Sequence, residues 1–314
     1  MNQPSSDLGR VLSIAASLLA VACAGARPQT RASPSAVAAV QLATVNGSSL
    51  AYASAGSGPP VVIVHGAWGD LRSFSRAASV LEPTNTVVRV SLRLHWPNAW
   101  PASEAEARET YRDEVLAADL VAFIERLGRG PVVLVGHSFG GVVAARATLA
   151  RPDLVRRLVL VEPALRGLLP ATPEGDRMRR EALEWRETMQ AKLRAGEDPL
   201  AVTRGMYDEG RPGTFDAFPE LRRRILTDNA RTMDPFLFNR AHMARLGCDE
   251  ARELAMPVLL IEGERTDDEM RAIGTAALAC LPDARRVVLP GAGHAIQFDA
   301  PEAMARAVAS FAAE

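Results

Sequence analysis

The chain has 314 residues, of which 48% are hydrophobic, and it carries a formal net charge of -1 with a pI near 6.6. This apolar content supports a sizeable core and excludes disorder for the bulk of the chain. The near-neutral charge lacks the basic surplus that nucleic-acid binding requires, so we expect a neutral or small-molecule substrate and no nucleic-acid partner.

The first 26 residues have the layout of a signal peptide. Arg10 precedes an apolar run over residues 11–22, and small residues follow. The run is shorter than the roughly 20 apolar residues that span a bilayer. It therefore predicts export to the periplasm or the extracellular space, followed by a linker over residues 27–39.

Two cleavage sites are possible in this segment. The tripeptide Ala24-Gly25-Ala26 fits an ordinary signal peptidase, whereas a lipoprotein signal would end before Cys23 and leave that cysteine lipidated. Lipidated Cys23 would then be the means of membrane attachment. A buried N-terminal helix is a third alternative.

Six short apolar runs predict the strands of one sheet, with a first strand expected near Val40. They cover residues 61–66, 86–92, 131–138, 157–163, 257–263 and 285–291. Continuous apolar runs are typical of parallel strands covered on both faces. The amphipathic stretch 111–128 predicts a helix that ends at Gly128. We expect a layered α/β domain with its core in residues 40–163 and 254–314.

Residues 164–253 interrupt this alternation. The interval has helical patches, many arginines and no convincing strand, so it predicts a helical cap inserted between two strands. The run Arg222-Arg223-Arg224 is expected to be a solvated helix face rather than an anion site.

The run 61–66 ends in His65-Gly66-Ala67-Trp68. A glycine after the strand would let the main chain approach a nucleophile closely, so the amide of Ala67 is a candidate for an oxyanion hole. Trp68 is expected to contact the substrate. His65 is expected to hold the loop by hydrogen bonds rather than to transfer protons.

The segment Gly136-His137-Ser138-Phe139-Gly140 has the pattern G-x-S-x-G between a predicted strand and a predicted helix. A sharp turn there requires small flanking residues and exposes the serine hydroxyl at the carboxyl edge of the sheet. Ser138 is the candidate nucleophile. The amide of Phe139, at the start of the helix, is the second candidate for the oxyanion hole.

His294 follows the last predicted strand in a loop of small residues, before a terminal helix. From that loop a histidine can reach the sheet edge where Ser138 lies. A neutral imidazole can take the serine proton during attack and return it to the leaving group, so His294 is the candidate general base.

These motifs together resemble the α/β-hydrolase superfamily over nearly everything after residue 40, and in particular its esterase and haloperoxidase-like members. The resemblance implies an eight-stranded, mostly parallel sheet, a nucleophile after the fifth strand, and the chain order serine, acid, histidine. A serine at position 138 argues against the dehalogenase and epoxide-hydrolase branches, which use an aspartate there.

Several residues are candidates for the catalytic acid. The resemblance implies an acid after the strand 257–263, where this chain has Thr266, and a threonine cannot carry the charge that stabilises an imidazolium. Some family members, including certain haloalkane dehalogenases, carry the acid after the preceding strand instead, which here ends in Glu162. We expect Glu162 to be the acid. Asp267 is the main alternative, and Asp268, Glu264 or no acid remain.

These residues predict a serine hydrolase that cleaves a small or medium carboxylic ester through an acyl-serine intermediate, without a cofactor or a metal. Acyl transfer, perhydrolysis and carbon–carbon bond hydrolysis are alternatives on the same triad. A non-catalytic ligand-binding protein of this fold is the alternative of a different class. Cys248 and Cys280 are expected to be free and buried, with pairing in an oxidising compartment as the other possibility.

Overall fold

The computed structural model describes residues 39–239 and 246–314. The predicted signal peptide, Cys23 and the linker up to residue 38 lie outside these residues. The strands are β1 (Val40–Val45), β2 (Ser48–Ala55), β3 (Pro60–Val64), β4 (Thr86–Val90), β5 (Val132–His137), β6 (Val155–Val161), β7 (Val258–Gly263) and β8 (Ala284–Leu289).

The described helices comprise those of the sheet region and those of an insertion. In the sheet region they are α1 (Ser75–Leu81), α2 (Glu104–Thr110), α3 (Asp113–Leu127), α4 (Phe139–Ala150), α10 (Cys248–Ala251), α11 (Asp268–Cys280), α12 (Ile296–Asp299) and α13 (Pro301–Ala313). In the insertion they are α5 (Pro173–Arg194), α6 (Pro199–Asp208), α7 (Thr214–Ala217), α8 (Glu220–Asn229) and α9 (Met233–Phe238).

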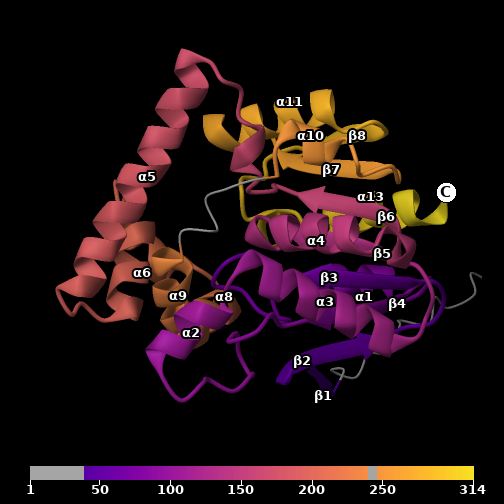
Figure 1. Ribbon diagram of the computed structural model, residues 1–314, viewed down its shortest axis with the longest axis horizontal. Coiled ribbons are helices and arrows are strands. Elements are labelled where there is room, and N and C mark those ends of the chain that lie inside the picture. The colour runs from indigo at the N-terminus through magenta and orange to yellow at the C-terminus, as the bar shows by residue number, and fades with distance from the viewer. Residues whose placement is uncertain (1–38, 240–245) are drawn as a thin grey trace, which may run out of the picture. The chain divides into compact units, whose positions relative to one another are not determined.

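The eight strands form one sheet in the order β1-β2-β4-β3-β5-β6-β7-β8 (Figure 1). The pairs β1–β2 and β2–β4 are antiparallel, and every pair from β4 to β8 is parallel. This confirms the predicted eight-stranded, mostly parallel sheet. Because parallel strands end at the same edge, the loops after β3, β5, β6, β7 and β8 meet there.

The core lies on both faces of this sheet. Alternate residues of β3 enter different clusters, Val62 and Val64 on one face and Val61 and Ile63 on the other, as the two-residue period of a strand requires. Helices α3, α4 and α11 cover the first face, and α1 and α13 cover the second. Burial on both faces explains the continuous apolar runs of the sequence.

Helices α5 to α9 form the predicted helical cap, which leaves the sheet after β6 and returns before β7. In Figure 1, α5, α6, α8 and α9 gather to one side of the strands. The cap has a small apolar core of its own, built from Met189, Val202, Met233 and Leu237. Across residues 39–239 and 246–314, no helix combines the length and apolarity needed to cross a membrane.

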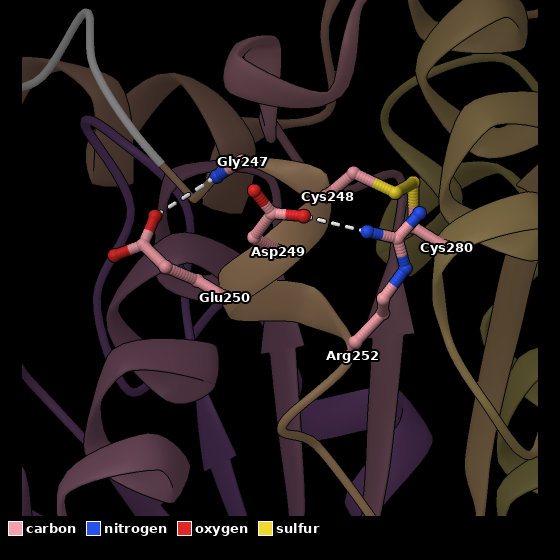
Figure 2. The surroundings of a disulfide bond; sticks show 6 residues. All are labelled: Gly247, Cys248, Asp249, Glu250, Arg252 and Cys280. Atoms are coloured by element: carbon pink, nitrogen blue, oxygen red, sulfur yellow. Dashed lines mark hydrogen bonds and ion pairs between the residues drawn. A yellow bond between two sulfur atoms is a disulfide. The ribbon is translucent and has the colours of Figure 1, made fainter.

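A disulfide joins Cys248, at the start of α10, to Cys280, at the end of α11 (Figure 2). Their Cα atoms lie 5.1 Å apart, within the range that a disulfide spans. The expectation of two free cysteines was therefore wrong. The packing of α10 against α11 brings the two together across 32 positions of sequence, which spacing alone does not reveal.

Candidate active site

Ser138 lies at a sharp turn between β5 and α4. Its backbone has φ 51° and ψ -119°, a conformation that L-residues rarely adopt. The amide of Ser138 donates to the carbonyl oxygen of Val161 (2.9 Å), and its own carbonyl accepts from Gly141 (2.9 Å) and Ala164 (3.1 Å). These contacts hold the strained turn and fix the serine hydroxyl at the sheet edge.

The two glycines of the motif are required by close packing. A Cβ on Gly136 would overlap the main chain of Gly140 and Gly141, and a Cβ on Gly140 would overlap the carbonyl of His65. The turn can therefore form only with glycine two positions before and two positions after the serine, which is the physical content of the pattern G-x-S-x-G.

His294 lies between Ser138 and Glu162. Its Nε2 is 3.1 Å from the hydroxyl oxygen of Ser138, and its Nδ1 is 3.2 Å from Oε2 of Glu162. Nδ1–H donates to the carboxylate, which leaves the Nε2 lone pair facing the serine hydroxyl. The structure thus brings together the three residues that the sequence singled out as nucleophile, base and preferred acid.

Glu162 is a buried carboxylate with three donors. Its side chain is fully buried, and its main chain also has a positive φ, of 45°. Oε1 accepts from the amide of Gly263 at 2.7 Å, and Oε2 accepts from Nδ1 of His294 and from the hydroxyl of Thr266. Thr266, which stands where the family acid was expected, therefore serves as a hydrogen-bond donor to the acid on the neighbouring strand.

The alternative acids have other partners. Asp267 caps α11, since its carboxylate accepts from the amide of Met270 at 2.8 Å. Glu264 accepts from the amide of Gly291 at 2.8 Å, and Asp268 lines a separate hollow beside Cys248. Among the described residues, Glu162 is the carboxylate that contacts His294.

His137 forms a hydrogen bond with the main chain of the loop that carries His294. Burial is the main cause that lowers the pKa of His137 to about 3, so its ring is neutral at pH 7. Its Nε2 lies 2.9 Å from the carbonyl oxygen of His294 and must carry the proton, because a carbonyl can only accept. The residue before the nucleophile thus holds the main chain of the base.

A second buried histidine holds the loop after β3. Nδ1 of His65 lies 2.8 Å from the carbonyl of Gly66, and its Nε2 accepts from the amide of Leu92 at 3.0 Å. Burial lowers the pKa of His65, which keeps the ring neutral for this double contact. His65 therefore holds this loop by hydrogen bonds, as the sequence predicted. The loop that it fixes carries Ala67 and Trp68.

Two cavities open beside Ser138, and both are lined by Ala67, Trp68, Ser138 and His294. The first, of about 300 Å³, is called here the apolar chamber. Phe139 lines it too, so it contains both candidate residues of the oxyanion hole. Its other walls are mainly apolar and include Val142, Trp185, Met206, Phe236 and Met270.

The second cavity, of about 320 Å³, is called here the arginine chamber. Helix α8 of the cap contributes Arg222, α6 contributes Tyr207, and α12 contributes Gln297 and Phe298. The expected solvated face therefore holds for Arg224, which is exposed, whereas Arg222 and Arg223 are half-buried.

The chain belongs to the α/β hydrolase family, since residues 61–307 match the model of that family. It is similar to 2-(acetamidomethylene)succinate hydrolase from Mesorhizobium japonicum, with 29% identity over 275 residues, 82% of this chain and 88% of the relative. It is similar to the sn-1-specific diacylglycerol lipase ABHD11 of Mus musculus, with 25% identity over 81% of each chain. Its fold is similar to that of a bromoperoxidase from Bacillus anthracis, with a TM-score of 0.71 at 20% identity over 88% of this chain and all of that one.

Sequence reasoning missed Arg222, Gln297 and the supporting role of His137. His137 stood inside the motif, but the burial of its ring is known only from the structure. No signal singled out Arg222 from the two arginines that follow it, because the phase of α8 depends on how the cap packs.

Proposed function

We propose that this α/β hydrolase is a serine hydrolase that cleaves carboxylic esters of small or medium size through an acyl-serine intermediate. The observation that carries the proposal is the hydrogen-bonded series Ser138–His294–Glu162 at a strained turn. In this series each residue has the partner that its role requires.

The proposed reaction begins with attack by the hydroxyl oxygen of Ser138 on the ester carbonyl, while Nε2 of His294 takes the hydroxyl proton. The ionised Glu162 stabilises the imidazolium that forms. The amides of Ala67 and Phe139 stabilise the developing oxyanion. Return of the proton from His294 to the alcohol oxygen releases the alcohol, and water then cleaves the acyl-serine by the same steps.

The buried Glu162 supports an enzyme over a non-catalytic binding protein, because the missing acid at position 266 was the only argument for the latter. The volume of the apolar chamber, about 300 Å³, supports a small or medium substrate group. Acyl transfer, perhydrolysis and carbon–carbon hydrolysis would use the same residues, so product analysis distinguishes them.

A fluorophosphonate probe and a series of p-nitrophenyl esters of increasing chain length test this proposal. We expect the wild-type protein to gain one probe adduct on Ser138 and to hydrolyse the shorter esters. Ser138→Ala should lose the adduct and about a million-fold in turnover. Ser79→Ala, which changes an exposed serine on α1, is the matched control and should behave as wild type. Unchanged ester hydrolysis by verified Ser138→Ala would refute the assignment.

We also propose that the protein is exported, as its N-terminal sequence predicts. The disulfide between Cys248 and Cys280 supports this, because disulfides persist in oxidising compartments. Fractionation of the producing cells, followed by determination of the N-terminus, tests it. A mature chain that starts at residue 27 would support ordinary secretion, a lipidated Cys23 would support a lipoprotein, and an intact chain in the cytoplasm would overturn the proposal.

A further inference from the structure

Arg222 brings a cation to the wall of the candidate active site. It lines the arginine chamber together with Ser138 and His294. Its guanidinium carbon lies 3.7 Å from the ring centre of Phe218, 5.2 Å from that of Phe298 and 5.7 Å from that of Tyr207. The cation thus lies among three aromatic rings in the wall of the arginine chamber.

This cation has no carboxylate partner among the described residues, 39–239 and 246–314. Asp299, which also lines the chamber, instead accepts from the amide of Gly293 at 2.9 Å. Arg222 also lies in the first turn of α8, where the helix dipole disfavours a positive charge. Aromatic contacts compensate part of this cost, and an anion in the chamber would compensate the rest.

Other arginines near the site are already satisfied. Arg166 in the apolar chamber forms a two-point ion pair with Glu269, with both contacts at 2.8 Å. Arg223, next to Arg222, donates to the main-chain carbonyl of Asp216. Arg222 therefore differs from these two, because its contacts in the described part of the chain are aromatic rings and a hydrogen bond with Tyr207, and none is a carboxylate or a main-chain carbonyl.

The arginine chamber is also lined by a side chain whose amide oxygen has no partner. Gln297 is 7% exposed, and its Oε1 has no hydrogen-bond partner in the described part of the chain. Rotation of the terminal amide exchanges this oxygen for an NH₂ donor. A planar anion at Arg222 would then find a second donor across the same cavity.

We propose that Arg222 binds a carboxylate of the substrate, so that the enzyme prefers esters that carry a carboxylate on one side of the scissile bond. The inference rests on the proposed ester hydrolysis and adds its specificity. The apolar part of such a substrate occupies the apolar chamber, and the carboxylate occupies the arginine chamber. The guanidinium fork matches a carboxylate in geometry, which a lysine in its place would not.

Two pairs of esters separate the acyl side from the alcohol side. Monoethyl glutarate and ethyl pentanoate differ by a carboxylate in place of the terminal methyl group of the acyl chain. The butyrate esters of 4-hydroxybenzoate and 4-hydroxybenzamide differ by a carboxylate on the alcohol. In wild type we expect a higher kcat/KM for the anionic member of one pair, and that pair shows which side of the ester enters the arginine chamber.

Arg222→Gln tests the residue itself. We expect it to lower kcat/KM for the preferred anionic ester by between about tenfold and a hundredfold, the range for a charged hydrogen bond. The neutral twin should change by less than about threefold, which also shows that the variant is folded. Arg222→Lys should retain part of the preference. Arg223→Gln, the matched control, should retain all of it.

Equal rates for both members of both pairs in wild type would overturn the inference, as would an equal loss on anionic and neutral esters in Arg222→Gln. Absence of turnover with every ester would instead refute the proposed function. In that event calorimetric binding of monoethyl glutarate and 4-(butyryloxy)benzoate to Ser138→Ala, with and without Arg222→Gln, decides the inference. Binding of either ester that Arg222→Gln abolishes supports it, and binding unaffected by the change, or no binding, contradicts it.

Discussion

The sheet region and the helical cap contribute different parts of the site and are built in different ways. Ser138 and Glu162 follow strands that are largely buried in the apolar clusters on both faces of the sheet, and His294 follows the partly exposed edge strand β8. The cap has an apolar core of four buried residues, and its side chains, such as Trp185 and Arg222, line the two chambers. The residues proposed to catalyse the reaction thus belong to the region with the larger core, and the residues proposed to select the substrate belong to the region with the smaller core.

The joint between the two regions contains several directional polar contacts. Asn229 on α8 donates to Asp70 at 2.7 Å and accepts from the amide of Trp96 at 2.8 Å. Arg72 forms ion pairs with Asp70 and with Asp228 of the cap. Directional contacts of this kind fix the orientation of α8 over the loop that carries Ala67. Aromatic contacts of Trp68 and Phe139 with Phe236 of the cap add apolar packing to the same joint.

The largest expected effect tests the acid within the sheet region. Glu162→Gln keeps the size of the side chain and removes the charge that stabilises the imidazolium, so turnover should fall about 10⁴-fold, as in serine proteases. Asp267→Asn, the matched change on the N-cap of α11, should cost less than about tenfold. Ester hydrolysis rates of the two purified variants decide the ranking. The reverse order would make Asp267 the acid, and two mild effects would mean that Ser138 and His294 act as a dyad.

Removal of the disulfide measures how much it stabilises the attachment of α10, which follows the cap, to α11 of the sheet region. It closes a loop of 32 positions, for which the chain-entropy model gives about 3 to 4 kcal/mol of stability. The double variant Cys248→Ala/Cys280→Ala should lose up to that amount in urea denaturation. Its ester turnover should stay near wild type, because neither cysteine lines the two chambers. A reductant should destabilise wild type and leave the double variant unchanged; equal effects on both would contradict this account.

A pH dependence of stability is expected from the buried His137 of the sheet region. Its folded pKa, about 3, lies below the ordinary value of 6.5, so protons bind the unfolded chain first. Stability is complete above pH 6.5 and is lost as the pH falls from 6.5 towards 3. Between pH 7 and pH 5 His137 should account for a loss of about 2 kcal/mol in the free energy of unfolding.

Urea denaturation at pH 7 and pH 5 of wild type and His137→Gln measures this contribution. The variant should lose about 2 kcal/mol less than wild type over that interval. The buried His65 and His95, whose pKa values burial also lowers, remain in both proteins and cancel in the comparison. An identical pH dependence of stability in wild type and variant would show that His137 binds protons equally in the folded and the unfolded state.

The smallest expected effect concerns Thr266, a positioning residue that acts through Glu162. Thr266→Val keeps the shape and removes the hydroxyl donor, while Gly263 and His294 still contact the carboxylate. The lost hydrogen bond should lower kcat about tenfold and leave KM nearly unchanged. Thr266→Ser should restore the rate. A change confined to KM would instead place Thr266 among the residues that shape a substrate pocket.

The features that could be predicted from the sequence are those that depend on local patterns of residues. The parallel sheet follows from apolar runs, and the turn at Ser138 follows from glycines that have no room for a Cβ. The contact of Glu162 with His294 required the resemblance, because it depends on how two loops meet. The pairing of Cys248 with Cys280 and the direction of Arg222 depend on helix packing between distant segments, for which a single sequence carries no local signal.

The hydrogen bond between Thr266 and Glu162 has an evolutionary consequence. An aspartate at position 266 would place a second carboxylate against Glu162, and two carboxylates at that separation cannot both remain ionised. A glutamine at 162 with a threonine at 266 would leave no acid at all. A lineage that moves its acid from one strand to the next therefore passes through a form with two opposed carboxylates or a form with no acid, unless both positions change together. Residues 162 and 266 are accordingly expected to be inherited as a pair.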